Sequence, residues 1–219
     1  VRMIKINFAG IRTFSFVDYP KKICAVVYTP GCNFKCPWCH NWKIAYTKNY
    51  SSMEEIHVLN KLIYLKKRIS AVCITGGEPT IHSYLPKFIQ KLKHLRYSVK
   101  LDTNGTNPEM VKCLIENNMI DYIALDIKAK PENYSKLIGK NDYLFFKISR
   151  TIDILRNSTI DYEFRMTFVP GLSNEEDINF FENFLKDEEK GYITIANSTE
   201  LFQVKRQYSD FNINKLILR

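Results

Sequence analysis

The chain has 219 residues, and its 32 basic and 23 acidic side chains give a formal net charge of +9. Hydrophobic residues make up 45% of the chain and charged residues 25%, as is typical of a soluble globular protein. This composition excludes a disordered, collagen-like or coiled-coil chain, and no apolar run approaches the roughly 18 residues of a membrane-spanning helix. Residues 1–16 contain no continuous apolar run like that of a signal peptide, so we expect a cytoplasmic protein.

Apolar runs rich in β-branched and aromatic residues alternate with helical patterns along the chain. The runs predicted to be strands are residues 23–28, 71–74, 99–101, 122–127, 162–169 and 192–196. The segments predicted to be helices are residues 53–67, 86–95, 108–117 after the N-cap Asn107, 142–156, and 174–190 after Ser173. Strands separated by helices form right-handed βαβ units, so the sequence predicts an α/β fold with a parallel sheet.

The excess of basic residues has two interpretations. Many lysines fall in segments with a helical pattern, as in residues 61–68 and 87–100, where a solvated charged face is the simpler interpretation. A contact surface for an acidic partner or RNA is the alternative.

A polar or glycine-containing motif lies at the end of each predicted strand. The motifs are Thr29-Pro30-Gly31-Cys32, Thr75-Gly76-Gly77-Glu78-Pro79, Asp102-Thr103-Asn104-Gly105, Asp126-Ile127-Lys128, Val169-Pro170-Gly171 and Asn197-Ser198. Because the carboxyl ends of parallel strands meet at one edge of the sheet, we expect an active site there. Ordinary turns would explain the glycine, proline and asparagine residues, but they do not explain charged residues within a strand.

Because side chains alternate along a strand, the sequence predicts which face of the sheet the charged residues occupy. It places Asp126 and Lys128 on one face of the fourth strand and its isoleucine and leucine side chains on the other. Glu163, Arg165 and Thr167 likewise share one face of the fifth strand. We therefore expect the apolar face to pack on helices and the charged face to line the cleft. Internal salt bridges are one explanation for the charges, and contacts to a polar ligand are the favoured one.

Cys32, Cys36 and Cys39 lie within eight residues in the loop predicted to follow the first strand. A structural zinc site usually has four ligands in two pairs, whereas only three thiols are close together here. Three thiolates could instead bind three irons of a [4Fe–4S] cluster and leave the fourth iron open to another ligand. The remaining cysteines stand alone in apolar settings, and we expect them to be core residues: Cys24, Cys73 and Cys113.

This cysteine spacing, with Gly76-Gly77-Glu78-Pro79 after the second strand, resembles the radical S-adenosylmethionine (SAM) superfamily. A finer resemblance, to the activating enzymes of glycyl radical enzymes, rests on Cys39-His40-Asn41, Asp18-Tyr19-Pro20, Asp102-Thr103-Asn104-Gly105, Asp126-Ile127-Lys128 and Val169-Pro170-Gly171. Within that family the chain is most similar to the short activating proteins of anaerobic ribonucleoside-triphosphate reductase. The resemblance covers about residues 11–197. It implies a partial (βα)6 TIM-like barrel in a single domain, 1–219, with residues 201–219 as a C-terminal tail or an extra strand.

The resemblance also implies the cofactors and their ligands. Cys32, Cys36 and Cys39 would bind one [4Fe–4S] cluster, and SAM would bind its open iron. The implied SAM-binding residues are Trp38, Gly76, Gly77, Glu78, Asp102, Thr103, Asp126, Lys128 and Arg165. A monovalent cation held by Asp102, Thr103 and Asp126 is a further candidate cofactor. Asp18 would lie near the mouth of the site and His40 next to the cluster ligands. No side chain would act as a catalytic acid or base, because the cluster and SAM carry the chemistry.

The implied reaction is reductive cleavage of SAM to a 5′-deoxyadenosyl radical, which removes a hydrogen atom from a glycine of a partner enzyme. The implied partners are a glycyl radical enzyme, expected to be anaerobic ribonucleotide reductase, and a reduced flavodoxin or ferredoxin-type electron donor. No membrane or nucleic-acid partner is expected. Residues 15–20 depart from the Asp-Gly-Pro-Gly form of pyruvate formate-lyase activating enzymes, which argues against that particular assignment.

Two other functions remain open on the sequence. One is a short radical SAM enzyme that acts on a small molecule, such as a deazapurine synthase; His40-Asn41 after the third cysteine, in place of Asp-Thr, disfavours it. The other is a non-catalytic iron–sulfur or zinc module that binds RNA, which the three-cysteine count and Gly76-Gly77-Glu78-Pro79 disfavour.

Overall fold

The computed structural model describes residues 7–139, 144–204 and 216–218, and its main sheet is parallel except at one edge. The strand order is β10-β9-β8-β7-β6-β5-β3-β2, with only β2 antiparallel to its neighbour. The strands are β2 (Gly10–Ser15), β3 (Cys24–Thr29), β5 (Ala71–Gly76), β6 (Ser98–Thr103), β7 (Tyr122–Asp126), β8 (Asp161–Phe168), β9 (Gly191–Ile195) and β10 (Ile217–Leu218). A separate pair joins β1 (Asn7–Phe8) to β4 (Met53–Glu54).

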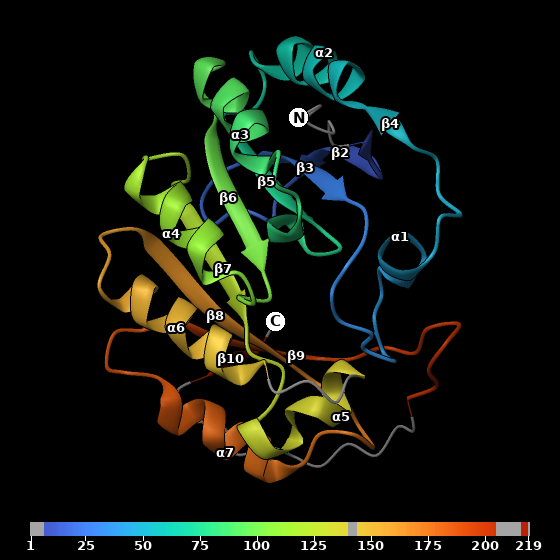
Figure 1. The fold of residues 1–219 in the computed structure, drawn as a ribbon, viewed down its shortest axis with the longest axis vertical. Coiled ribbons are helices and arrows are strands. Elements are labelled where there is room, and N and C mark those ends of the chain that lie inside the picture. The colour runs from blue at the N-terminus through green and yellow to red at the C-terminus, as the bar shows by residue number, and fades with distance from the viewer. Residues whose placement is uncertain (1–6, 140–143, 205–215, 219) are drawn as a thin grey trace.

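Helices occupy every connection between consecutive parallel strands from β3 to β9, and Figure 1 shows the longer ones around the outside of the curved sheet. The longer helices are α2 (Glu55–Leu65), α3 (Leu85–His94), α4 (Pro108–Glu116), α6 (Phe145–Arg156) and α7 (Glu175–Phe184). Two short helices are α1 (Trp42–Tyr46) and α5 (Tyr134–Ile138), and single 3-10 turns lie at Pro79–Ile81 and Pro131–Asn133. The sheet edges, β2 and β10, do not pair with each other, so the molecule is a partial barrel of the TIM type.

All six predicted strands are confirmed, as β3 and β5 to β9. Ile217 and Leu218 form β10, a seventh parallel strand, within the segment whose structure the sequence left open; residues 205–215 and 219 of that segment lie outside the described residues. The helix expected from residue 142 begins at Phe145, and residues 142–143 also lie outside them. Asn107 is confirmed as an N-cap, whereas the last helix is capped by Asn174 rather than Ser173.

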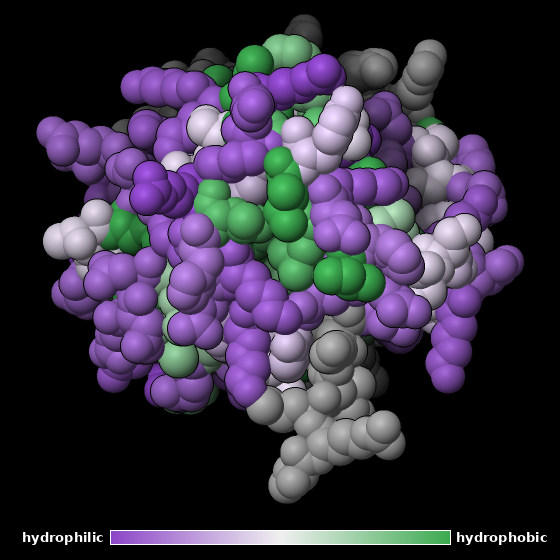
Figure 2. Space-filling model, turned by 90° about the horizontal axis from the view of Figure 1, so that it is seen from above, coloured by the Kyte–Doolittle hydropathy of each residue, from purple (hydrophilic) through white to green (hydrophobic). Residues whose placement is uncertain are grey.

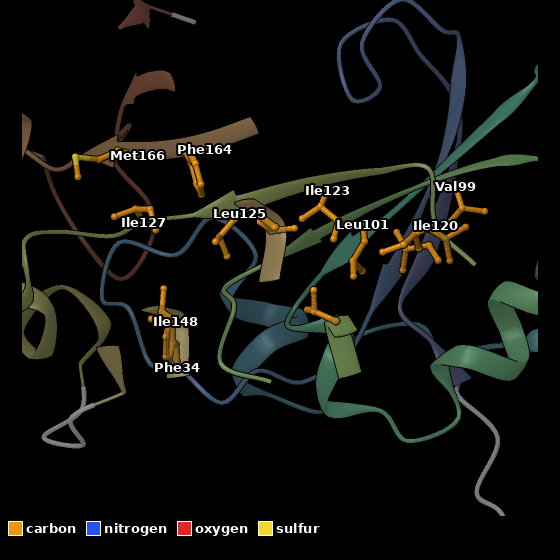
Figure 3. Close-up of a cluster of buried hydrophobic side chains, with 14 of the residues drawn as sticks. Phe34, Val99, Leu101, Ile120, Ile123, Leu125, Ile127, Ile148, Phe164 and Met166 are labelled. Carbon is orange, nitrogen blue, oxygen red and sulfur yellow. The ribbon is translucent and has the colours of Figure 1, made fainter. Parts of the chain in front are cut away.

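The main hydrophobic core lies between the sheet and its helices, as the strand pattern predicts. Ile123 and Leu125 of β7 and Ile127, just past its end, are buried in it, and Figure 3 shows them in one cluster with Ile148 of α6. Phe34, from the loop that carries the cysteines, belongs to the same cluster. The cysteine loop is therefore anchored to the core by a large apolar side chain.

Two expectations about the burial of side chains are wrong. Cys113 is exposed, because α4 directs Val111 and Leu114 inward and leaves Cys113 on its outer face. Lys100 does not belong to a solvated helix face. It lies in β6, is 1% exposed, and forms ion pairs inside the barrel. Cys24 and Cys73 are core residues, as expected.

The outer face of α2 carries exposed hydrophobic side chains. Ile56 and Ile63, seven residues apart and therefore on one face, are each 54% exposed. Figure 2 views the molecule from the end where α2 lies and shows hydrophobic side chains gathered within a mostly hydrophilic surface. No helix in the described part of the chain is long and apolar enough to cross a membrane.

Candidate active site

A cavity of about 210 Å³ lies at the carboxyl ends of the parallel strands. It is lined by every predicted site residue except Arg165: Cys32, Cys36, Cys39, Trp38, Gly76, Gly77, Glu78, Asp102, Thr103, Asp126 and Lys128. These residues come from the ends of β5, β6 and β7 and from the loop after β3. The structure thus brings together motifs that are as far as 96 positions apart, from Cys32 to Lys128.

The loop that carries the cysteines is held by backbone hydrogen bonds to its surroundings. The Lys35 amide donates to the carbonyl of Ile138 over 2.8 Å, and the Gly31 amide donates to that of Ile44 over the same distance. The indole Nε1 of Trp38 donates to the Leu137 carbonyl over 3.1 Å. The end of α5 and the middle of α1 therefore fix both sides of the loop.

The thiols of Cys32, Cys36 and Cys39 are free and face the same cavity. Burial raises the pKa of Cys32 to about 11 and that of Cys36 to about 12, so these thiols need a bound cationic centre to become thiolates. No three His, Cys, Asp or Glu side chains of the described residues converge on a single metal ion. Three thiols spread around one cavity suit a cluster in which each thiolate binds its own iron, and the donor set fits a [4Fe–4S] group.

Two glycines allow the loop after β5 to pack against the cysteine loop. A Cβ atom on Gly76 would lie 2.5 Å from the Thr29 carbonyl oxygen, and one on Gly77 would lie 1.7 Å from that of Gly31. Across this contact the Gly77 amide donates to Thr29 and the Glu78 amide to Gly31, each over 2.8 Å. The close approach that requires glycine here is between two segments of the chain itself.

Glu78 connects this glycine loop to the loop after β6. Its fully buried carboxylate accepts hydrogen bonds from the amide and hydroxyl of Thr80, the hydroxyl of Thr103 and the amide of Asn104. Burial nevertheless outweighs these donors and raises the pKa of Glu78. Glu78, one of the predicted SAM-binding residues, therefore also organises the cavity wall.

Below the cavity, acidic and basic side chains alternate across three strands. Arg165 donates from Nε to Asp126 over 3.0 Å and from a terminal nitrogen to Asp102 over 3.2 Å. Lys100 donates to the other oxygen of Asp102, and Lys128 to the other oxygen of Asp126 over 2.9 Å. The internal salt bridges expected from the sequence are therefore present, and Asp102, Asp126 and Lys128 also line the cavity, while their contacts to a polar ligand stay a prediction.

The network fixes the protonation of its members. Burial alone would raise the pKa of Asp126, but Lys128 and Arg165 outweigh it and lower that pKa to about 2. Burial would likewise raise the pKa of Asp102, but Arg165 and Lys100 lower it. Although burial opposes its charge, Lys128 has a raised pKa because Asp126 lies beside it. Asp126 stays ionised and Lys128 protonated, so Lys128 can neutralise an anionic ligand group.

Three other expectations concern residues around the cavity. Asp18 lies at the amino end of β3, where Ser15 and Arg12 contact it, and not at the cysteine end of that strand. His40 is exposed and lies on the cavity wall. Asp102 and Asp126 are already bonded to basic side chains, so the monovalent cation remains a prediction.

The structure adds side chains that the motifs did not single out. Asn41 donates from Nδ2 to the Gly76 carbonyl over 2.9 Å, and the Tyr46 hydroxyl donates to the Cys36 carbonyl over 3.1 Å. Asn104 donates to Asn33 over 2.8 Å and so links the cysteine loop to the loop after β6. The sequence could have identified Asn41 and Asn104 as site residues, because both lie within the motifs Cys39-His40-Asn41 and Asp102-Thr103-Asn104-Gly105. No motif in the sequence includes Tyr46.

Comparison with known proteins places the chain in a family. The family model described as the radical SAM superfamily matches residues 26–183. One relative is a Methanocaldococcus jannaschii protein that is named, by inference, a glycyl-radical enzyme activating enzyme. It is 37% identical to this chain over 189 residues, which cover 84% of this chain and 77% of the relative. The pyruvate formate-lyase-activating enzyme of Clostridium pasteurianum is 25% identical over 195 residues, covering 84% of this chain and 78% of the relative.

The fold is shared with solved structures. A structure of TYW1 with a lysine-pyruvate adduct bound superposes with a TM-score of 0.61 at 18% identity, covering 82% of this chain and 67% of the other. At that identity the likeness concerns the fold alone. The family model includes all three loop cysteines and every predicted site residue, and it matches most of the chain. This protein belongs to the radical SAM superfamily.

Proposed function

We propose that this protein is an activating enzyme that generates a glycyl radical on a partner enzyme, and that the partner is anaerobic ribonucleotide reductase. The observation that carries the radical SAM chemistry is the convergence of three loop cysteines, the glycine loop and Lys128 on one cavity. The activating role is supported by the relatives of that name, which align with 84% of this chain. The partner is proposed from the motifs of the cysteine loop and strand ends.

The family's cofactors are a [4Fe–4S] cluster and SAM, which when bound supply the electron and the adenosyl radical for hydrogen abstraction. Cys32, Cys36 and Cys39 would hold the cluster. Lys128, protonated beside Asp126 and 5.2 Å from the Trp38 ring, would neutralise the SAM carboxylate. Trp38 lines the same cavity and would lie next to the adenine of SAM.

The cavity provides positioning and exclusion of water rather than acid–base catalysis. The carboxylates of Glu78, Asp102 and Asp126 all accept hydrogen bonds from protein donors. Hydrogen-atom abstraction from a glycine Cα requires no proton acceptor, so this arrangement suits the proposed reaction. The electron would come from a reduced flavodoxin or ferredoxin-type protein.

The proposed partner is tested by mixing the anaerobically reconstituted protein with anaerobic ribonucleotide reductase, SAM and dithionite, and recording electron paramagnetic resonance (EPR) spectra. We expect a glycyl radical signal that depends on SAM and disappears with the Cys36→Ala variant. A reductase whose radical-bearing glycine is replaced by alanine serves as the matched control and should give no signal.

The same experiment separates the remaining alternative. If 5′-deoxyadenosine accumulates while the reductase acquires no radical, the proposed partner is wrong. If an added small molecule then raises 5′-deoxyadenosine formation and is itself consumed, the protein is a small-molecule radical SAM enzyme.

A further inference from the structure

A second groove, of about 630 Å³, lies beside the cysteine cavity. One wall is the segment that follows Cys39, and the other is the segment that leaves the carboxyl end of β9. The lining residues are His40, Asn41, Trp42, Lys43, Ile44, Ser198, Thr199, Glu200 and Gln203. His40 and Asn41 also line the cysteine cavity, so the groove continues from that cavity onto the surface of the molecule.

The first wall of the groove is attached to the framework of the cavity. Asn41, which precedes α1, donates from Nδ2 to the Gly76 carbonyl over 2.9 Å. Within α1, the Ile44 carbonyl accepts from the Gly31 amide over 2.8 Å. A five-residue helix has little stability of its own, so these contacts set the position of this wall.

The second wall is a turn organised by Thr199. The Thr199 hydroxyl accepts hydrogen bonds from the amides of Leu201 and Phe202 over 3.3 Å and 3.1 Å, and its amide donates to the Phe202 carbonyl over 2.8 Å. The Ser198 hydroxyl accepts from the Val204 amide over 3.0 Å. Both walls are therefore formed in the free protein, and a ligand of the groove avoids the entropic cost of ordering them.

The charges in the groove nearly cancel. The Lys43 ammonium pairs with the Glu200 carboxylate across the groove over 2.7 Å, and apart from His40 the other lining residues carry no formal charge. The two paired side chains are 56% and 67% exposed, so the pair contributes little and can separate for a ligand. A phosphate-bearing small molecule would require an excess of basic groups. Amides, hydroxyls and the Trp42 indole suit a polypeptide segment instead.

The proposed reaction also requires a peptide to lie close to the cysteine cavity. The reacting group is a glycine Cα within a protein chain, and it must come within about 3–3.5 Å of the atom that abstracts its hydrogen. The cavity itself has only about 210 Å³ and is lined by the predicted cofactor-binding residues. The residues on either side of the glycine must therefore lie outside the cavity, and the groove offers an adjoining surface for them.

The two walls differ in their relation to the superfamily. The wall from His40 to Ile44 lies within residues 26–183, which match the radical SAM model, whereas the wall at residues 198–203 lies beyond them. A superfamily with many substrates shares its cofactor-binding part, so selection of one partner is expected in loops outside that part.

We propose that this groove binds the glycine-bearing segment of the partner enzyme, and that residues 198–203 determine which segment fits. The proposal rests on the proposed function and deepens it, because it assigns the protein substrate to a particular surface of this chain. It concerns recognition of the partner and not the cleavage of SAM.

The test uses a fluorescein-labelled synthetic peptide that spans the radical-bearing glycine of anaerobic ribonucleotide reductase. Its binding to the reconstituted protein with SAM is followed by fluorescence anisotropy. Ser198→Trp fills the groove from an exposed position, so we expect it to raise the Kd of the peptide by about tenfold or more and that of SAM far less. Ser83→Trp, at an exposed residue that lines neither the groove nor the cavity, is the matched control. Equal peptide affinity of the two variants would overturn the proposal.

A crosslinking measurement decides the matter even if Ser198→Trp folds poorly. The photoreactive residue p-benzoylphenylalanine in place of Gln203 should crosslink to the peptide on irradiation, as identified by mass spectrometry. The same residue in place of Tyr64, which is 73% exposed on α2, should give no crosslink. A peptide that binds the wild type but does not crosslink from position 203 would contradict the proposal.

Glycyl radical formation on the whole reductase separates this proposal from the proposed function. Ser198→Trp should raise the reductase concentration that gives half the maximal EPR signal. If that concentration equals the wild-type value, the groove is wrong and the proposed function stands. If the wild type neither binds the peptide nor forms the radical, the proposed partner is wrong and the groove assignment falls with it.

Discussion

Replacing Gly77 with alanine should destabilise the folded protein by more than about 3 kcal/mol, the upper end of ordinary single substitutions. The new methyl carbon would lie 1.7 Å from the Gly31 carbonyl oxygen. Because that atom belongs to the backbone of the cysteine loop, one of the two loops must move. The hydrogen bonds from Gly77 to Thr29 and from Glu78 to Gly31 would then be lost. Denaturant unfolding and the iron content after reconstitution measure the effect.

Gly171→Ala is the matched control for this substitution. Gly171 has a φ of +88°, but a Cβ atom there would meet nothing within 4 Å. This control introduces backbone strain without a steric clash. We expect it to lower the free energy of unfolding by about 1 kcal/mol and to leave iron binding intact. If Gly77→Ala retains wild-type stability and full iron content, the packing of the glycine loop on the cysteine loop is not as described.

Replacing Arg165 with methionine should cost about 3 kcal/mol of stability at neutral pH. Arg165 is the one side chain that contacts both Asp102 and Asp126 in the described network, and its side chain is only 25% exposed. Removing one partner of a buried ion pair leaves the other charge poorly compensated, which is more costly than the net value of the pair. Two carboxylates would then repel each other beneath the cavity. Denaturant unfolding of the anaerobic protein measures the loss.

The loss should depend on pH in a defined direction. The pKa of Asp126 in the folded protein is about 2, below its ordinary value of 3.8, so ionised Asp126 stabilises the fold above about pH 4. That contribution disappears as the pH falls towards 2. Without Arg165 the pKa of Asp126 should rise, so the difference in stability between variant and wild type should shrink between pH 4 and pH 2. A difference that does not change with pH would contradict this explanation.

Arg12→Met provides the control for a charge lost at the surface. The side chain of Arg12 is 58% exposed, and its ion pair with Asp18 spans 3.7 Å. Surface pairs contribute little, so this substitution should cost less than about 1 kcal/mol and show no comparable dependence on pH.

Strands β3 and β5 to β9 could be predicted because most of them are short, largely apolar runs and each is followed by or ends in a polar motif. A strand buried on both faces needs this composition. β2 was not predicted because Gly10–Ser15 is mostly exposed and polar, and it forms only through its pairing with β3. β1 and β4 have two residues each and carry no periodic signal.

The site could be predicted as a set of residues but not as a set of contacts. Cysteine spacing and strand alternation identified the groups around the cavity and the inward face of Asp126 and Lys128. They did not reveal that Arg165 contacts the carboxylates from below, since this depends on the register between β7 and β8. Nor did they reveal Tyr46, because a single tyrosine in a five-residue helix resembles any surface tyrosine.

The burial of Lys100 could not be predicted from the sequence. Lys100 lies where the lysine-rich segment 87–100 overlaps the predicted strand 99–101, and its charge alone does not distinguish it from the lysines of α3. Its burial follows from its place in β6, where Asp102 and Glu163 from the barrel interior surround its ammonium. Only the tertiary arrangement of acidic partners makes a buried lysine tolerable there.

The central claim is that the cysteine cavity performs radical SAM chemistry. Its most direct test is to reconstitute the protein with iron and sulfide, reduce it with dithionite, add SAM, and quantify 5′-deoxyadenosine beside the Cys36→Ala variant. We predict 5′-deoxyadenosine formation by the wild type and none by the variant. A wild-type protein with a full, reducible cluster that cleaves no SAM, even when anaerobic ribonucleotide reductase is added, would contradict the claim.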